Sequence, residues 1–180
     1  MRVMAKAFFL FAYLCFSLSG FGQKYQTEKS SITFFSSAPI EDIHAVNQGA
    51  KSLFDLSSGE IAVSIPISKF KFEKELMEEH FNEKYLESGK YPTASFSGKL
   101  KSPVTRGSDA RAIATGKLSL HGVTRNVTLE GDIHWIGDYI VMKSVFKIKL
   151  ADYKIKIPKL MWQNIAEEVE VNVELNFSPL

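Results

Sequence analysis

The amino-acid sequence predicts an all-β domain, and three observations lead to this prediction. Several stretches alternate apolar and polar residues with a period of two, turn-forming residues separate them, and only one segment has helical periodicity. Such alternation is typical of antiparallel strands with one buried and one solvated face. Eight or nine strands at hairpin spacing indicate a barrel or a sandwich. The predicted strands are 32–36, 40–46, 52–56, 61–70, 93–100, 112–120, 127–135, 146–150 and 169–177.

The first 22 residues are expected to be a signal peptide. Two basic residues precede an apolar run over 7–18, and Gly20 and Gly22 place small residues at −3 and −1 of the expected cleavage site. The run is shorter than the roughly 20 residues that span a bilayer. Cleavage near Gly22 leaves one domain, 23–180, and predicts a periplasmic or secreted location. An uncleaved N-terminal membrane anchor is the alternative.

The charge and cysteine content bound the class of protein. The chain carries 22 Lys and Arg against 20 Asp and Glu. Both basic residues in excess lie in the expected signal, so the remaining domain is close to neutral and nucleic acid is not a predicted partner. Cys15 also lies in the signal, so the domain has no thiol or disulfide. Its stability is therefore expected to rest on buried apolar surface.

The segment 73–88 is predicted to be an amphipathic helix. A helical wheel puts the apolar residues Leu76, Met77, Phe81 and Tyr85 on one half and most of the glutamates on the other. The apolar half is expected to pack on the sheet, and the acidic half to face solvent. Gly89 is expected to end the helix in a left-handed conformation, and the following Tyr-Pro corner leads to the next strand.

The sequence offers no pattern for catalysis or metal binding. None of its four histidines has a metal-ligand spacing, and neither a nucleophile elbow nor a phosphate-binding loop is present. His121 is expected to hold backbone groups at a hairpin, His80 to pack under the helix, and His134 to be solvated. We therefore predict a protein that is not an enzyme, with no catalytic residue, metal site or cofactor.

The inward-facing positions of the strands combine large and small side chains. An eight-stranded barrel is just wide enough to be filled by side chains or to hold one small ligand. Small residues at inward positions favour a cavity, but they would also accommodate large neighbours in a filled barrel, and both readings stay open at this point. The small residues are Ala94, Gly98, Ala112, Ala114 and Gly116, and the large ones Phe96, Trp135, Phe146 and Phe177.

Several short blocks resemble the YceI-like family, the lipid- and polyisoprenoid-binding periplasmic proteins of bacteria. Phe70-Lys71-Phe72 runs into "LMEEHF", and "YPTASFSGKL", "GKLSLHGVTRNV" and "KIKLADYKI" follow in that order. Together the blocks extend the resemblance over nearly the whole domain. The family often has Gly after the "ADY" tyrosine, whereas Lys154 stands here, so this turn is expected to differ.

The resemblance implies an eight-stranded antiparallel lipocalin-like barrel with one amphipathic helix inserted after the fourth strand. In the family, such a barrel holds a long isoprenoid or other apolar chain along its axis, and members are often dimers. The implied partners are thus an isoprenoid-like or other long-chain lipid and a second copy of the chain. The residues expected to line the pocket are Leu76, Met77, Phe81, Tyr85, Phe96, Ala112, Ala114, Leu118, Trp135, Phe146, Ile148, Val171 and Val173.

The leading hypothesis is an exported binding protein for an amphipathic, chain-like lipid. The ligand would be a polyisoprenoid, an isoprenoid quinone or a fatty-acid-like chain, held for transport, storage or sequestration. Two alternatives stay open. One is a barrel enzyme acting on an apolar substrate, for which Arg125 and Asp152 are the ionisable residues of interest. The other is a filled barrel that serves as a stress-related scaffold.

Overall fold

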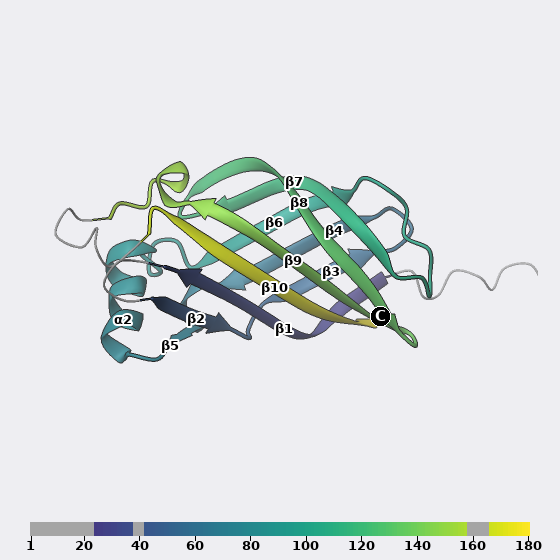
Figure 1. The fold of residues 1–180 in the computed structure, drawn as a ribbon, viewed down its shortest axis with the longest axis horizontal. Helices are drawn as coiled ribbons and strands as arrows, with labels where there is room; N and C mark the ends of the chain where they lie inside the picture. The colour runs from purple at the N-terminus through teal and green to yellow at the C-terminus, as the bar shows by residue number, and fades with distance from the viewer. Residues whose placement is uncertain (1–23, 38–41, 158–165) are drawn as a thin grey trace, which may run out of the picture.

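The protein folds into a closed, elongated β-barrel (Figure 1), seen in a computed structural model that describes residues 24–37, 42–157 and 166–180. Within these residues, ten strands form one antiparallel sheet. The sheet closes because β1 (Lys24–Ser36) pairs with β10 (Glu168–Pro179). The prediction of an antiparallel barrel is confirmed. The other strands are β2 (Ile43–Asn47), β3 (Lys51–Asp55), β4 (Glu60–Pro66), β5 (Phe70–Phe72), β6 (Thr93–Leu100), β7 (Ala110–Leu120), β8 (Val123–Ile136) and β9 (Tyr139–Lys149).

The ten strands of the described residues occupy eight strand positions around the barrel, which we call staves. Two of the staves each consist of two short strands. Strands β2 and β3 pair with the same edge of β1 in one continuous register, and residues 48–50 separate them. Strands β4 and β5 pair with β3 and β2 in turn, and the 3₁₀ turn η1 (Ile67–Lys69) separates them. The number of staves therefore agrees with the family resemblance.

Asn47 holds the two interruptions together. Its side chain is fully buried. Its Nδ2 amide donates a hydrogen bond to the Pro66 carbonyl at 2.7 Å, and its Oδ1 accepts one from the Gly49 amide at 2.8 Å. Since buried polar groups need partners, this one amide satisfies backbone atoms at both bends.

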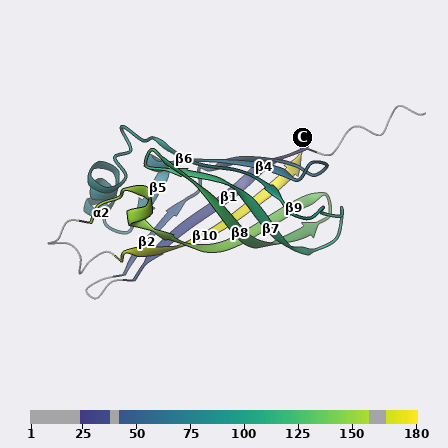
Figure 2. The same ribbon diagram turned by 90° about the horizontal axis from the view of Figure 1, so that it is seen from above.

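The predicted helix is present but shorter than expected. It comprises α2 (Glu75–His80) and a π-helical turn, η2 (Phe81–Tyr85), after β5 and at one end of the barrel (Figures 1 and 2). The prediction that Gly89 ends the helix was wrong. Glu87 adopts the left-handed conformation instead, with φ of 43°. Its carbonyl accepts hydrogen bonds from the Lys90 and Tyr91 amides, so the chain has already turned there.

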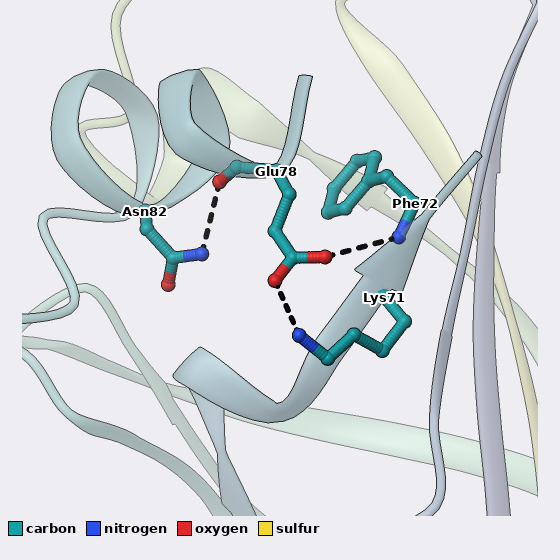
Figure 3. Close-up of polar contacts among 4 residues, drawn as sticks. All are labelled: Lys71, Phe72, Glu78 and Asn82. Atoms are coloured by element: carbon teal, nitrogen blue, oxygen red, sulfur yellow. Dashed lines mark hydrogen bonds and ion pairs between the residues drawn. The ribbon is translucent and has the colours of Figure 1, made fainter. Parts of the chain in front are cut away.

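Glu78 attaches α2 to the barrel (Figure 3). Its carboxylate accepts hydrogen bonds from Lys71 Nζ at 2.5 Å and from the Phe72 amide at 3.4 Å, both in β5. The side-chain amide of Asn82 donates to the Glu78 carbonyl at 2.9 Å. The acidic run is therefore not only a solvated face. One of its members, with a side chain 24% exposed, joins the helix to a strand.

Gly98 and Gly116 lie opposite each other on β6 and β7 and let the two backbones approach closely. A Cβ atom on Gly116 would lie 2.3 Å from the Ser97 carbonyl oxygen and 2.5 Å from the Gly98 Cα. These two glycines therefore allow β6 and β7 to pack closely where the sheet curves, and they do not line an interior cavity. Within the described residues, no helix has the length and apolar character needed to cross a bilayer.

Candidate functional site

An apolar cavity of about 150 Å³ lies inside the barrel at the end that α2 covers. Its wall is formed by side chains of β1 and β10, which close the barrel, and of strands on either side of this pair. Residues of α2, η2 and the 3₁₀ turn η3 (Leu150–Tyr153) complete the wall. Only two lining side chains carry hydroxyls. Ser36 Oγ accepts a hydrogen bond from the Ala166 amide at 2.9 Å. Burial raises the pKa of Tyr85, so its phenol stays neutral at physiological pH.

A second apolar cavity, of about 120 Å³, adjoins the first along the barrel. The two cavities share lining residues from five different strands, so they follow one another inside the same barrel. Ala112 and Ala114 line the second cavity, where their small side chains leave room. The shared residues are Ile32, Ile65, Leu118, Phe146 and Val173.

Four phenylalanines close the α2 end of the first cavity. Phe81, from η2, stacks on Phe34 of β1 with ring centroids 5.4 Å apart. It also contacts Phe70 and Phe72 of β5 at 5.4 and 5.0 Å. Such aromatic pairs add to the stabilisation from area burial. The helical segment thus closes one end of the cavity with a packed aromatic cluster.

Most residues that the sequence predicts for the pocket do line these cavities. Whether they contact a ligand stays a prediction. Met77, Phe81, Tyr85, Leu118, Phe146, Ile148, Val171 and Val173 line the first cavity, and Phe96, Ala112 and Ala114 line the second, together with three residues of the first set.

The structure corrects the expected placement of two residues. Leu76 is 61% exposed, because the six-residue α2 presents only a narrow arc to the barrel, and Met77 and Phe81 occupy that arc. Trp135 lies outside the lining of both cavities. Its ring packs edge-on against Tyr25, with centroids 6.0 Å apart, near the β8–β9 hairpin.

Sequence reasoning missed several lining residues, among them Phe34, Phe72 and Ile155. The alternation of Phe34 with Ile32 on the first predicted strand could have revealed it. Phe72 lies in a strand of only three residues, and Ile155 lies after η3 in a segment without periodicity, so neither carries a local signal.

The barrel wall divides between β8 and β9. Their pairing runs from the hairpin to Gly131 opposite Ser144 and ends there. Ser144 Oγ donates a hydrogen bond to the Glu130 carbonyl at 2.6 Å, at the point of division. The second cavity is lined there by outward-facing residues, including Asp132 and Lys143, as well as inward-facing ones. It therefore reaches the surface at this division.

Polar contacts join η3 to β8 and to the β7–β8 turn, and join this turn to the residues after η2. His121 Nδ1 donates to the Tyr153 carbonyl at 3.0 Å, and His121 Nε2 lies 2.8 Å from the Glu87 carboxylate. The expectation that His121 holds backbone is confirmed, although that backbone belongs to η3 and not to its own hairpin. Arg125 Nε donates to the Asp152 carbonyl at 2.7 Å, and Arg125 Nη2 lies 3.3 Å from the Asp152 carboxylate.

The other histidines and acids form no catalytic arrangement in the described part of the chain. His134 is half-exposed and lies 2.9 Å from Asp109, and this hydrogen bond lowers the pKa of the Asp109 carboxyl. His80 is half-buried in α2. Across residues 24–37, 42–157 and 166–180, no group of three or more His, Cys, Asp or Glu side chains is arranged to hold a metal ion.

The closed antiparallel wall and the apolar interior define a lipocalin-like β-barrel. The sequence model of the YceI-like domain matches residues 24–177, and the chain belongs to the YceI-like family. Protein YceI of Escherichia coli O157:H7 is 40% identical over 78 residues, which are 40% of this chain and 39% of that relative. The match thus spans well under half of that relative's length.

Two solved structures share the fold at low sequence identity. A polyisoprenoid binding domain from Saccharophagus degradans, implicated in plant cell wall breakdown, aligns with a TM-score of 0.77 and 17% identity, over 87% of this chain and 98% of its own. BcnA of Burkholderia cenocepacia aligns with a TM-score of 0.70 and 18% identity, over 82% of this chain and 95% of its own. At these identities the likeness establishes the architecture of the barrel.

Proposed function

We propose that this protein is an exported binding protein that holds one amphipathic, chain-like lipid inside its barrel. The ligand is a polyisoprenoid, an isoprenoid quinone or a fatty-acid-like chain, carried, stored or sequestered in the periplasm or outside the cell. The observation that carries this proposal is the pair of adjoining apolar cavities along the interior of one closed barrel. A chain, and not a compact ligand, fits two narrow spaces in series.

The volumes set the expected length of the buried tail. An apolar cavity of about 150 Å³ accepts a molecule of the size of benzene. The two cavities in series therefore accommodate on the order of ten carbons. At about 0.8 kcal/mol per buried methylene, such a tail gains roughly 8 kcal/mol before ordering terms. Micromolar affinity corresponds to about 8 kcal/mol of net binding free energy, so the buried tail alone sets micromolar binding as the upper limit of affinity.

The family and the chemistry of the interior support binding over catalysis. The solved relative from Saccharophagus degradans is described as a polyisoprenoid binding domain. In the described part of this chain, the ionisable pair Arg125–Asp152 lies at the surface with side chains 49% and 48% exposed. A barrel enzyme would need convergent titratable groups inside the cavity. Among the described lining residues, the first cavity has only the phenol of Tyr85, and the ionisable residues at the second, such as Asp132 and Lys143, face outward.

The test is a chain-length series on the delipidated protein. The neutral fluorescent probe N-phenyl-1-naphthylamine is bound first and then displaced by linear alcohols of increasing length. Each added methylene should tighten binding about fourfold, up to about ten carbons, after which the gain should level off. No displacement, or displacement independent of length, would refute the proposal.

The natural ligand, assembly state and location need separate measurements. Native mass spectrometry of protein isolated from its own cells should show one lipid mass per barrel, and the same spectra report whether the protein is a homodimer. Cell fractionation should place the protein, shortened near Gly22, outside the cytoplasmic membrane. An intact N-terminus in the membrane fraction would favour the uncleaved anchor.

A further inference from the structure

Strands β8 and β9 are neighbours in the barrel, yet they are hydrogen-bonded over only part of their length. Strand β8 pairs with β7 from Val123 to Ile133, and β9 pairs with β10 throughout. The ladder between β8 and β9 covers only the hairpin half, so 123–130 and 145–149 have no ladder between them. Closed barrels normally leave no strand edge unpaired. An unpaired stretch of this length between two long neighbouring strands therefore calls for a physical reason.

The stretch without pairing between β8 and β9 is bounded at both ends, and we call it the side window. At its hairpin end the strands meet at Gly131, where an added Cβ would lie 2.2 Å from the Lys143 carbonyl oxygen. At its other end, η3 crosses from β9 toward β8. The contacts of Arg125 with Asp152 and of His121 with Tyr153 hold η3 there. The side window is thus defined by structure at both ends.

The inner rim of the side window is apolar. Val127 and Leu129 of β8 and Phe146 and Ile148 of β9 are half-buried and pack against the core. Phe146 lines both cavities, so the side window lies over the place where the cavities adjoin. The part of the wall between the cavities and the side window is therefore apolar at these four positions.

Arg125 interrupts the inward pattern of β8 beside this rim. It lies opposite Leu118, which lines both cavities, and so occupies an inward-facing position. A charged residue in a place that the strand pattern reserves for apolar side chains is a local conflict of the kind that marks functional sites. The other residues with this orientation on β8 are Val123, Val127, Leu129, Gly131, Ile133 and Trp135.

The geometry points to the side window as the place of the ligand's polar end, with Arg125 binding an oxyanion headgroup, a carboxylate or a phosphate. A guanidinium forms strong paired hydrogen bonds with either group. Arg125 Nη2 lies 3.3 Å from the Asp152 carboxylate, and the oxygens of a bound headgroup would take the place of this carboxylate. The inference rests on the proposed function and adds to it the place and chemistry of the headgroup.

The competing explanation is that Arg125 only fastens η3 to β8. The two explanations differ for ligands that share a tail. If Arg125 binds the headgroup, Arg125→Gln should lower the affinity for dodecanoate and dodecyl phosphate by about tenfold and leave the affinity for dodecanol unchanged. Asp152→Asn, which removes the competing carboxylate, should leave the anionic ligands bound as tightly or more tightly. If Arg125 only fastens η3, both variants should weaken all three ligands alike.

The experiment is displacement of N-phenyl-1-naphthylamine from the delipidated protein by these three ligands, with inorganic phosphate as a fourth competitor. Arg106→Gln is the matched control, because Arg106 forms an exposed pair with Asp138 at the hairpin end, 2.7 Å apart. It should change no affinity. Displacement by inorganic phosphate alone would indicate a site for the free anion and overturn the headgroup assignment.

A mapping experiment tests the location without relying on affinity. Hexadecanoate with a diazirine beside its carboxylate should crosslink within 123–130 or 150–156, and crosslinks within 75–86 would overturn the inference. Equal affinities of the wild type and Arg125→Gln for every ligand would refute the role of Arg125 while leaving the proposed function intact. Failure of all three lipids to displace the probe from the wild type would instead refute the proposed function.

Discussion

The side-chain amide of Asn47 donates to the Pro66 carbonyl across 2.7 Å and so connects the bends of two neighbouring staves. In Asn47→Ala, the Pro66 carbonyl and the Gly49 amide lose their partner in a buried place. We expect the free energy of unfolding to fall by about 1–3 kcal/mol, measured by urea denaturation. Asn126→Ala, at an exposed position of β8, should change it by less than about 0.5 kcal/mol. Equal effects of the two variants would contradict this role.

Ala114→Phe should fill the second cavity and shorten the longest chain that binds well. A phenyl ring occupies a volume close to that of benzene, which fills an apolar cavity of this order. Dodecanol should therefore lose the gain of about four buried methylenes, on the order of a hundredfold in affinity, while hexanol, which the first cavity can hold alone, should lose little. Probe displacement provides the measurement. Ala62→Phe, on the exposed face of β4, is the control, and an equal loss there would argue against the assignment.

Lys154 adopts a left-handed conformation, with φ of 58°, at the position where the family often has glycine. A residue with a Cβ atom is strained in this conformation, whereas glycine is not. Lys154→Gly should remove that strain and raise the free energy of unfolding by about 0.5–1 kcal/mol, measured by urea denaturation. Lys156→Gly is the control and should leave stability unchanged or reduce it. A loss of stability in Lys154→Gly would show that the side chain is needed there.

Asp55 stabilises the turn between β3 and β4. Its carboxylate accepts hydrogen bonds from the Ser57 hydroxyl at 2.5 Å and from the Ser57 and Ser58 amides, and these bonds lower the pKa of Asp55. A pKa lowered by folding means stabilisation above the unfolded value of about 3.9, which is lost as the pH falls through the folded value.

Asp55→Asn should therefore lower the melting temperature at neutral pH, and the difference from the wild type should shrink near pH 3. Circular dichroism melts at both pH values provide the comparison. Glu60→Gln, an exposed acid on the same hairpin, is the control and should show no such trend. A difference that stays constant between the two pH values would exclude the charged form of Asp55 as its source.

The strands were predictable wherever alternation is strong. The predicted strand 93–100 and β6 have the same bounds, and 169–177 falls within β10. The first half of β1 was not predictable, because 24–31 lacks alternation and becomes a strand through pairing with β10. The bend at 48–50 likewise depends on the contact of Asn47 with Pro66, residues that are distant in sequence.

The pocket was predictable to the extent that strand alternation fixes inward positions. A helical wheel over 73–88 treats the segment as one long helix. The α-helix ends at His80, and the short α2 presents only a narrow arc to the barrel, which leaves Leu76 exposed. Small residues were ambiguous: Ala114 leaves space, while Gly116 permits a close backbone approach. The side window has no local signature, since the predicted strand 127–135 runs past the point where the pairing with β9 ends at Gly131 without any change in its pattern.

The pairing of β1 with β10 also governs the order in which the molecule can assemble. During synthesis, most strands can pair with a strand made shortly before. One edge of β1, however, pairs with a segment that is made about 140 residues later. Contacts of such sequence separation slow folding, because a long loop must close before they form. We therefore expect ring closure to be the late step of folding, and removal of the last dozen residues to leave an open, association-prone sheet.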